Sequence, residues 1–234
     1  MEDNVFLISI LFVISSIILK TYIKLMGEKI QINEYDQEAF KAYGNAIRLD
    51  PNFADSWYNK GVVLNSQGNY DAATKAFNEA IKLNPNDGKA WKNKGMTLGR
   101  RGNYDAAIIA FDEAIRLNPN DDEAWKNKGM TLSKQGNYDA AIKAFDEAIR
   151  LNPSSPELRF NKGNAIYQRG NYSESIKYLE EAIEMGISDA SIPQYRIGNA
   201  LRMLHRDSEA DAAYTKARKL GYSGPMTLME MFAK

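Results

Sequence analysis

The sequence predicts an all-α protein built from stacked helical hairpins, and repetition along the chain is the main reason. Tryptophans recur every 34 residues, at Trp57, Trp91 and Trp125. Two consecutive segments, 88–121 and 122–155, are near-copies with 26 identical residues in 34 aligned positions. A fixed period of this length is typical of solenoid proteins in which each repeat is one pair of helices.

Each repeat divides into two helices, as the first near-copy illustrates. Trp91, Gly95 and Leu98 follow one another at i, i+4 and i+7, which places them on one face of a helix. Gly102 can adopt the left-handed conformation that ends this helix. Asn103 is a good N-cap for a second helix.

The second helix of the repeat has its own apolar face, formed by Ala107, Phe111 and Ala114. Pro119 ends it, because proline cannot continue a helix. Small residues let the two backbones approach and large residues fill the remaining space. A single hairpin cannot bury this surface alone, so the repeats must stack.

The same positions recur throughout the array, and we expect them to form its core. The small residues expected at the helix crossings are Gly61, Ala73, Gly95, Ala107, Gly129, Ala141, Gly163 and Gly198. The large residues expected around them are Trp57, Phe77, Trp91, Phe111, Trp125 and Phe145.

This pattern of Trp, Gly, Leu, Ala, Phe, Ala and Pro closely resembles the tetratricopeptide repeat (TPR) family over residues 54–222. The resemblance implies a right-handed α-solenoid of TPR hairpins. The repeat 156–189 departs from the pattern, since Arg159 replaces the Trp and Leu179 the Phe, and the repeat 191–222 matches it more loosely. The usual Leu before the Gly is a lysine in four repeats. We expect each such lysine to lay its alkyl stem on the core and to keep its ammonium in water.

The chain is therefore expected to contain a repeat array with distinct segments at both ends. The expected repeats are 54–87, 88–121, 122–155, 156–189 and 191–222. Outside them we expect a short tail at 1–4, a hydrophobic anchor helix at 5–25, a degenerate or partial first repeat at 26–53, and a capping helix at 223–234.

The N-terminal segment differs in character from the repeats. Val5 to Leu19 contains no charged residue and is dominated by Val, Ile, Leu and Phe. A membrane span needs about 20 residues, and Lys20 can extend its ammonium to the interface. A retained transmembrane helix is the favoured interpretation; a cleaved signal peptide and a helix docked on the repeats are the alternatives. Lysines follow the segment and acids precede it, which predicts a single-pass membrane protein with a cytoplasmic array.

Composition excludes several classes of function. The chain has 30 Lys or Arg residues, 30 Asp or Glu residues, no Cys and one His. This balance gives no overall attraction to nucleic acid. His205 alone cannot build an imidazole metal cluster or a Ser-His-Asp arrangement. We expect no catalytic residues, no cofactor, no metal and no small-molecule substrate, because neither a phosphate-binding loop nor a metal-spaced cluster occurs.

In the TPR family the first helix of each hairpin lines the inner surface, and the resemblance places a ladder of polar residues there. These residues are Asn59, Asn93, Asn127, Asn161 and Arg196. An amide offers both a donor and an acceptor, which suits the main chain of an extended peptide. The expected neighbours of the ladder are Tyr58, Lys92, Lys126 and Phe160, with Met96, Met130 and Asn164 one turn on and Arg100 and Lys134 beyond them.

This mixture of cations, aromatics and Met favours a partner with acidic and apolar side chains. Some TPR domains grip a C-terminal carboxylate, but Met130 and Ile192 stand where that motif has Asn and Lys. The sequence thus predicts a membrane-tethered adaptor or scaffold that binds a protein or peptide in its groove. A co-chaperone or assembly factor and, more remotely, the substrate-selecting subunit of an enzyme are the alternatives. Self-association through an exposed apolar end of the solenoid is a further alternative.

Overall fold

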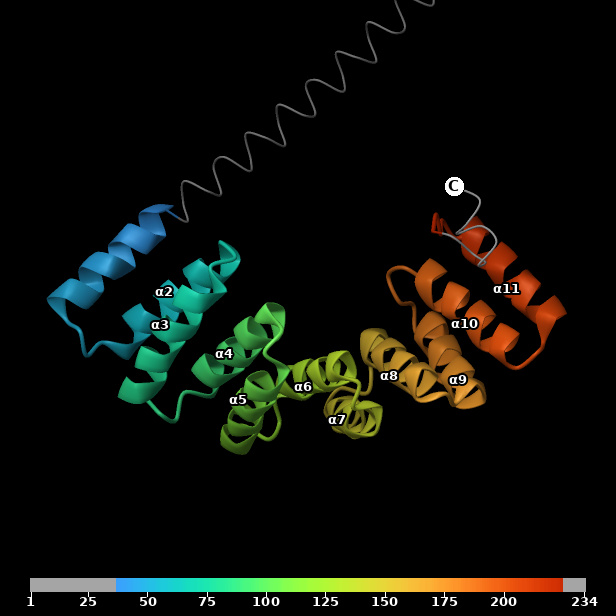
Figure 1. Ribbon diagram of the computed structural model, residues 1–234, viewed down its shortest axis with the longest axis horizontal. Helices are drawn as coiled ribbons and strands as arrows, with labels where there is room; N and C mark the ends of the chain where they lie inside the picture. Colours follow the sequence, from blue (N-terminus) through green and yellow to red (C-terminus); the bar gives the residue numbers. More distant parts are fainter. Residues whose placement is uncertain (1–36, 225–234) are drawn as a thin grey trace, which may run out of the picture. The chain divides into compact units, whose positions relative to one another are not determined.

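The computed structural model of the protein describes residues 37–224, and every regular element in this range is a helix (Figure 1). Residues 37–49 are helical. The helices that follow are α2 Ala54–Ser66, α3 Tyr70–Leu83, α4 Gly88–Arg101, α5 Tyr104–Leu117, α6 Asp122–Gln135, α7 Tyr138–Leu151, α8 Pro156–Arg169, α9 Tyr172–Glu184, α10 Ser191–Met203 and α11 Asp207–Lys219. The predicted all-α class is confirmed for this part of the chain.

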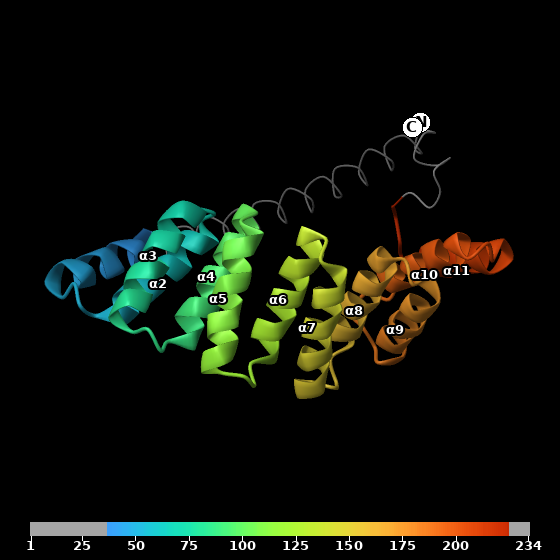
Figure 2. The ribbon, with the colours of Figure 1, turned by 60° about the horizontal axis from the view of Figure 1, so that its bottom comes forward.

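The chain divides into two compact units, Met1–Leu83 and Asn84–Lys234. In the first unit α2 packs against α3. The second unit contains four hairpins, in which α4 packs on α5, α6 on α7, α8 on α9 and α10 on α11. Each of these hairpins also packs on the next, through the second helix of one and the first helix of the following one (Figure 2).

Polar caps and left-handed glycines set the ends of the helices in the second unit. The Asp87 side chain accepts hydrogen bonds from the backbone N–H groups of Lys89 and Ala90 at the start of α4. The Asn103 side chain caps α5 in the same way, as its position in the sequence predicts. Gly102, between the two helices, has a φ of 86°, a backbone conformation that favours glycine. The caps and short loops therefore set where each helix of a hairpin begins and ends, and they depend only on nearby residues.

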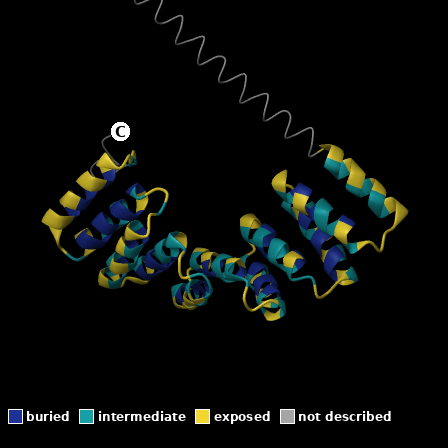
Figure 3. Ribbon diagram, turned by 180° about the vertical axis from the view of Figure 1, so that it is seen from behind, coloured by how far each residue is buried: buried dark blue, intermediate teal, exposed yellow. Residues whose placement is uncertain are grey.

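Glycine on the first helix and phenylalanine on the second allow the two helices of a hairpin to pack closely. A Cβ atom added to Gly95 would lie 2.8 Å from Cε1 of Phe111, and one added to Gly129 would lie 2.7 Å from Cε1 of Phe145. Both phenylalanines are buried. Figure 3 shows buried residues on the helix faces that meet and exposed residues at the turns.

The tryptophans have a different role from the phenylalanines. Trp91 is only half-buried, and its indole N–H donates a 3.0 Å hydrogen bond to the carbonyl of Pro85. Trp125 makes the equivalent bond to Pro119 at 3.1 Å. Each tryptophan thus fastens the turn that precedes its own repeat, in addition to filling space.

Two of the four lysines that precede the helix-crossing glycines do not leave their ammonium groups to water alone, contrary to expectation. Lys128 of α6 pairs with Asp112 of α5, and Lys162 of α8 pairs with Asp146 of α7. The Lys162 ammonium also donates a 2.7 Å hydrogen bond to the hydroxyl of Tyr178. These lysines connect one hairpin to the preceding one, because their partners lie on the neighbouring second helix.

The expected localisation is corrected by the structure. Among the described residues, no helix combines the length and apolar character that a membrane span requires. A single-pass membrane protein is therefore not supported, and the prediction was wrong because it depended on one uncharged run that is shorter than a span and ends at Lys20. The predicted anchor over 5–25, the beginning of the partial repeat over 26–53 and most of the predicted capping helix over 223–234 lie outside the described residues.

Candidate functional site: a cleft across the first helices

The first helices of the second unit form one continuous face. α4 contacts α6, α6 contacts α8, and α8 contacts α10. In the described part of this unit, no such contact joins one second helix to the next. The first helices therefore lie closer together than the second helices, and the stack bends toward them. We call this side the first-helix face.

Two adjoining clefts open on the first-helix face. Cleft 1 has a volume of about 190 Å³ and is lined by Met96, Gly99, Arg100, Phe111, Asn127, Met130, Thr131 and Lys134. Cleft 2 has a volume of about 450 Å³ and is lined by Met130, Ser133, Lys134, Tyr138, Phe145, Asn161, Asn164, Ala165, Gln168 and Arg196. Met130 and Lys134 belong to both, so the two clefts form a continuous depression that runs across α4, α6, α8 and α10.

Polar atoms without hydrogen-bond partners are concentrated in the walls of these clefts. Among the described residues, the buried side-chain atoms that lack a partner are Nδ2 of Asn127, Oγ of Ser133 and Oδ1 of Asn164. Such atoms are rare in folded proteins, because leaving one buried and unpaired costs about 1–3 kcal/mol. The clefts therefore have both donor and acceptor capacity that the fold itself does not use.

The asparagine ladder is not uniform. Asn127 lines cleft 1 and Asn161 lines cleft 2. Asn93 instead donates a 3.0 Å hydrogen bond from Nδ2 to the carbonyl of Lys89, four residues earlier in its own helix. Identical positions in successive repeats thus have different local partners.

Lys92 and Lys126 occupy equivalent positions, yet their environments differ. Nζ of Lys92 lies 2.9 Å from Asp121 and 3.1 Å from Glu123. Burial disfavours the charged form of Lys92, but the hydrogen bonds that its ammonium donates to these two acids outweigh this effect and raise its pKa. Lys126 makes no ion pair with any described residue: Ser155 replaces the first of the two acids, and the second, Glu157, accepts a hydrogen bond from the Ser155 hydroxyl. Lys92 is therefore a link between hairpins, while the charge of Lys126 is not used within the fold.

Arg196 lies at the α10 end of cleft 2, among aromatic side chains. Burial and the neighbouring Tyr172 raise the pKa of Tyr167, whereas the positive charge of Arg196 opposes this. Tyr195 stacks on Tyr222 with ring centroids 4.2 Å apart. The α10 end of cleft 2 is thus lined by the guanidinium of Arg196, while Tyr195 and Tyr222 lie outside the lining.

Three further residues of the expected groove are placed elsewhere. Phe160 packs against the core of the last two hairpins and lines neither cleft. Tyr58 and Asn59 belong to α2 of the first unit, where the ring of Tyr58 lies 6.0 Å from that of Phe77. Sequence reasoning did not identify Ser133 and Gln168 as lining residues. Their spacing could have identified them, because Ser133 lies one helical turn after Met130 and Gln168 lies one turn after Asn164.

A second type of cleft lies on the other side of the second unit, between α5 and α7. Its floor contains Trp125, Lys128 and Leu132, and its volume is about 620 Å³. A cleft of about 630 Å³ in the first unit is lined by the equivalent residues of an earlier repeat, including Trp57 and Lys60. These clefts are a property of the repeat itself, and their lysines and tryptophans already interact with each other.

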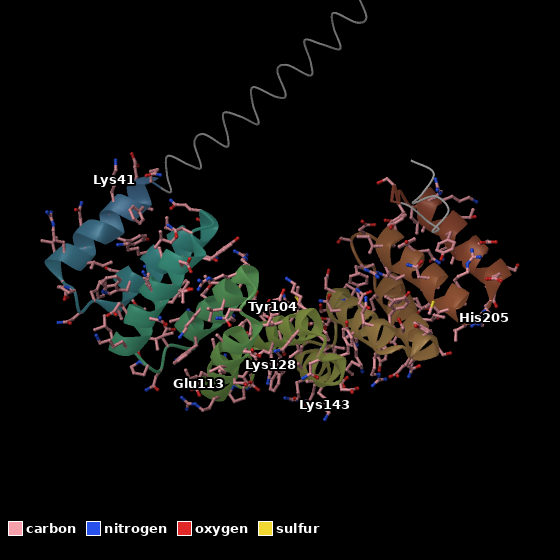
Figure 4. The ribbon with its side chains drawn as sticks, in the orientation of Figure 1. Lys41, Tyr104, Glu113, Lys128, Lys143 and His205 are labelled. Atoms are coloured by element: carbon pink, nitrogen blue, oxygen red, sulfur yellow. The ribbon has the colours of Figure 1, made fainter. Side chains whose placement is uncertain are left out.

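Candidate metal ligands do not cluster in the described residues. No group of three His, Cys, Asp or Glu side chains in this part of the chain could hold a metal ion. His205 lies in the turn between α10 and α11 with its side chain exposed, far along the chain from the cleft residues of α4 and α6 (Figure 4).

Comparisons with known proteins agree with this architecture. The tetratricopeptide repeat family matches residues 54–87 and, in overlapping pairs of repeats, 92–156, 126–191 and 161–225. No curated protein matches the chain significantly. Solved structures with the same fold include MamA 41-end from Desulfovibrio magneticus RS-1, which has a TM-score of 0.68, is 20% identical, and is aligned over 71% of this chain and 94% of MamA.

Two other solved structures extend the comparison. YrrB, described as a TPR protein with an unusual peptide-binding site, has a TM-score of 0.67 and 20% identity over 82% of this chain and 97% of YrrB. The APC/C hetero-tetramer Cut9-Hcn1 has a TM-score of 0.62 and 19% identity over 80% of this chain and 37% of that chain. At these identities the likeness concerns the fold alone. The family match covers more than half of the sequence, and the chain belongs to the tetratricopeptide repeat family.

Proposed function

We propose that the chain is a protein-interaction scaffold that holds an extended polypeptide segment in clefts 1 and 2 of its first-helix face. The continuity of the two clefts through Met130 and Lys134 is the observation that carries the proposal. A depression that crosses several helices accommodates a chain laid perpendicular to them. The solved structure of YrrB, a peptide-binding TPR protein of the same fold, is compatible with this use of the fold.

The unpaired polar atoms of Asn127, Ser133 and Asn164 explain how such a segment would bind without a fixed sequence. A peptide main chain presents alternating N–H and C=O groups, and small rotations of these side chains would let them pair with it. Each new hydrogen bond contributes about 0.5–1.5 kcal/mol net. Met96 and Met130 would adapt to apolar side chains of varied shape.

The test is a selection of binding peptides from a random displayed library, using the full chain as the target. Dissociation constants of the selected peptides are then measured for a variant carrying Asn127→Ala, Asn161→Ala and Asn164→Ala. The matched control carries Lys143→Ala and Lys216→Ala, which are exposed on the second helices α7 and α11. We expect binding to weaken about tenfold or more in the first variant and to be unchanged in the control.

Two results would contradict the proposal. If no peptide is selected, the chain does not bind extended segments. If the control variant loses affinity while the asparagine variant keeps it, the cleft between α5 and α7 is the binding surface. The selection also separates an adaptor from a co-chaperone: a narrow consensus among the peptides supports the adaptor, and general binding of unfolded chains supports the co-chaperone.

A further inference from the structure

The charges of the second unit are segregated between its two sets of helices. The first helices α4, α6, α8 and α10 contain thirteen Lys or Arg residues and three Asp or Glu residues. The second helices α5, α7, α9 and α11 contain seven Lys or Arg residues and thirteen Asp or Glu residues. The formal net charge of +0 for the whole chain thus conceals one cationic and one acidic side.

The three acids on the first helices are already engaged by the fold. Asp122 accepts a 2.9 Å hydrogen bond from Asn152. Glu123 pairs with Lys92, and Glu157 accepts a hydrogen bond from the hydroxyl of Ser155. All three lie in the first turn of their helices. They therefore do not neutralise the cations toward the other ends of the helices.

Three cations that line the clefts make no ion pair with any described residue. Arg100 lines cleft 1, Lys134 lines both clefts, and Arg196 lines cleft 2. Other cations of the same helices are paired, for example Arg169 with Asp139 and Arg202 with Asp211. Three cations without an ion pair thus face the depression formed by the two clefts.

We infer that the ligand of the first-helix face is an acidic extended peptide whose carboxylates contact Arg100, Lys134 and Arg196; this inference rests on the proposed function. Hydrogen bonds between charged partners are about twice as strong as neutral ones. The carboxylates belong to side chains within the peptide, so a free C-terminus is not required.

The spacing of the acids follows from the spacing of the helices. Packed helices lie about 8–10 Å apart, and an extended chain advances about 3.3 Å per residue. Arg100 and Lys134 lie on neighbouring first helices, which separates their carboxylates by about three residues. Arg196 lies two helices beyond Lys134, with Gln168 of α8 between them. An acidic residue at every third position would match the spacing of Arg100 and Lys134. Arg196 is at the position of the asparagine ladder, about two turns earlier in its helix, so a peptide that reaches it crosses the helices obliquely.

The probes are synthetic peptides with blocked ends. The first has four repeats of Glu-Val-Thr, the second has the same composition with its four Glu residues adjacent, and the third replaces each Glu by Gln. Valine and threonine favour the extended conformation. We expect the spaced peptide to bind most tightly, the clustered peptide several-fold more weakly and the Gln peptide most weakly. Raising the salt concentration from about 50 mM to about 300 mM should remove most of this difference.

Charge-matched variants of the full chain locate the interaction. The cleft variant carries Arg100→Gln, Lys134→Gln and Arg196→Gln. The control variant carries Lys143→Gln, Lys177→Gln and Lys216→Gln, which removes the same charge from exposed positions on α7, α9 and α11. We expect the cleft variant to bind the spaced peptide about tenfold or more weakly and the control variant to change less than about twofold.

Four outcomes would overturn the inference. Equal loss in both variants would mean that overall charge, not the cleft, attracts the peptide. Equal affinity for the spaced and Gln peptides would show that the clefts do not prefer acidic peptides. The proposed function would still stand if peptides selected from the library bind through Asn127. Binding only when the peptide C-terminus is unblocked would indicate a terminal-carboxylate site. If the chain forms a salt-sensitive dimer that the spaced peptide does not dissociate, the first-helix face binds the acidic second helices of another copy instead of a peptide.

Discussion

Glycine on the first helix of each hairpin is required by contact rather than by backbone conformation. Gly95 lies inside α4, and nothing in its backbone demands a glycine. Glycine is required because the Phe111 ring, which is 1% exposed, lies where the Cβ of a larger residue would be. Gly99 lies one turn later in the same helix, where an added Cβ would come no closer than 3.5 Å to another residue, at Oγ1 of Thr131. Comparing substitutions at the two glycines therefore distinguishes the effect of packing on stability from the effect of helix propensity.

Replacing Gly95 with Ala should destabilise the protein, whereas replacing Gly99 with Ala should stabilise it. Alanine is favoured over glycine in a helix by about 1 kcal/mol. At Gly95 this gain is offset by overpacking against Phe111, which costs about 1–3 kcal/mol. The check is the midpoint of chemical denaturation for each variant against the parent chain. A Gly95→Ala variant as stable as Gly99→Ala would show that the phenylalanine ring moves freely, contrary to its burial.

At the scale of the helices, neighbouring hairpins are joined by ion pairs as well as by apolar contacts. Lys162 and Lys128 occupy the same position in successive repeats, and each pairs with an aspartate of the preceding helix. The two aspartate side chains are equally exposed, at 50%, but Lys162 is 9% exposed and Lys128 is 21% exposed. The cost of losing the acid should follow the burial of the lysine, because a buried charge without a partner is destabilising.

Asp146→Asn should therefore cost more stability than Asp112→Asn. We expect about 1–2 kcal/mol for Asp146→Asn, after allowance for the solvent that reaches this acid, and less than about 1 kcal/mol for Asp112→Asn. Thermal or chemical denaturation at neutral pH measures both. An equal effect of the two substitutions would mean that the burial of Lys162 does not strengthen its dependence on Asp146.

The same pair predicts how stability changes at alkaline pH. Burial lowers the pKa of Lys162, but the hydrogen bonds to Asp146 and Tyr178 outweigh it, so the pKa lies above its ordinary value of 10.5. A raised lysine pKa contributes stability that is complete below the ordinary value and is lost as the pH rises through the raised one. The loss should be smaller in the Asp146→Asn variant, because that variant has already lost the partner that raises the pKa.

Local sequence was sufficient to predict the helices, but not the partners of the cleft residues. Caps such as Asn103 and turn glycines such as Gly102 act within a few residues, so their effects follow from spacing alone. Lys92 was assigned to the groove because its position suited a ligand. Its actual partners, Asp121 and Glu123, are about 30 residues away, and only the stacking of the hairpins brings them close.

The charge segregation was present in the sequence but could not be interpreted without the fold. The overall balance of 30 cations and 30 acids indicated no overall attraction to nucleic acid, and the cations expected near the ladder favoured an acidic partner. Assigning each charge to a first or a second helix requires the helix bounds, and deciding which cations remain unpaired requires their neighbours. The same limitation explains the corrected localisation, which was inferred from an isolated apolar run with no structural context.

Stability within the second unit should decrease toward its last hairpin. Side chains cap every helix from α4 to α9, and the Asp189 side chain accepts a 2.9 Å hydrogen bond from the backbone N–H of Ser191 at the start of α10. Arg206 before α11 makes no side-chain cap. His205 stands where the earlier turns have a glycine and has a φ of 58°, the one non-glycine residue with positive φ among those described. The missing cap of α11 costs about 1 kcal/mol, and the left-handed histidine adds about 1 kcal/mol or more of strain.

Hydrogen exchange should therefore be faster in α10 and α11 than in α5–α7, by roughly thirtyfold for a difference of about 2 kcal/mol. A variant carrying His205→Gly and Arg206→Asn restores the Gly-Asn turn of the preceding hairpins, as at Gly170 and Asn171. This variant should slow exchange in α10 and α11 while leaving α5–α7 unchanged, because stacked repeats open from their ends and each repeat depends mainly on its neighbours. Mass spectrometry of exchanged peptides from the full chain measures both regions in one experiment. Uniform exchange across the unit, or equal slowing of every helix in the variant, would instead indicate that the hairpins unfold as a single cooperative block.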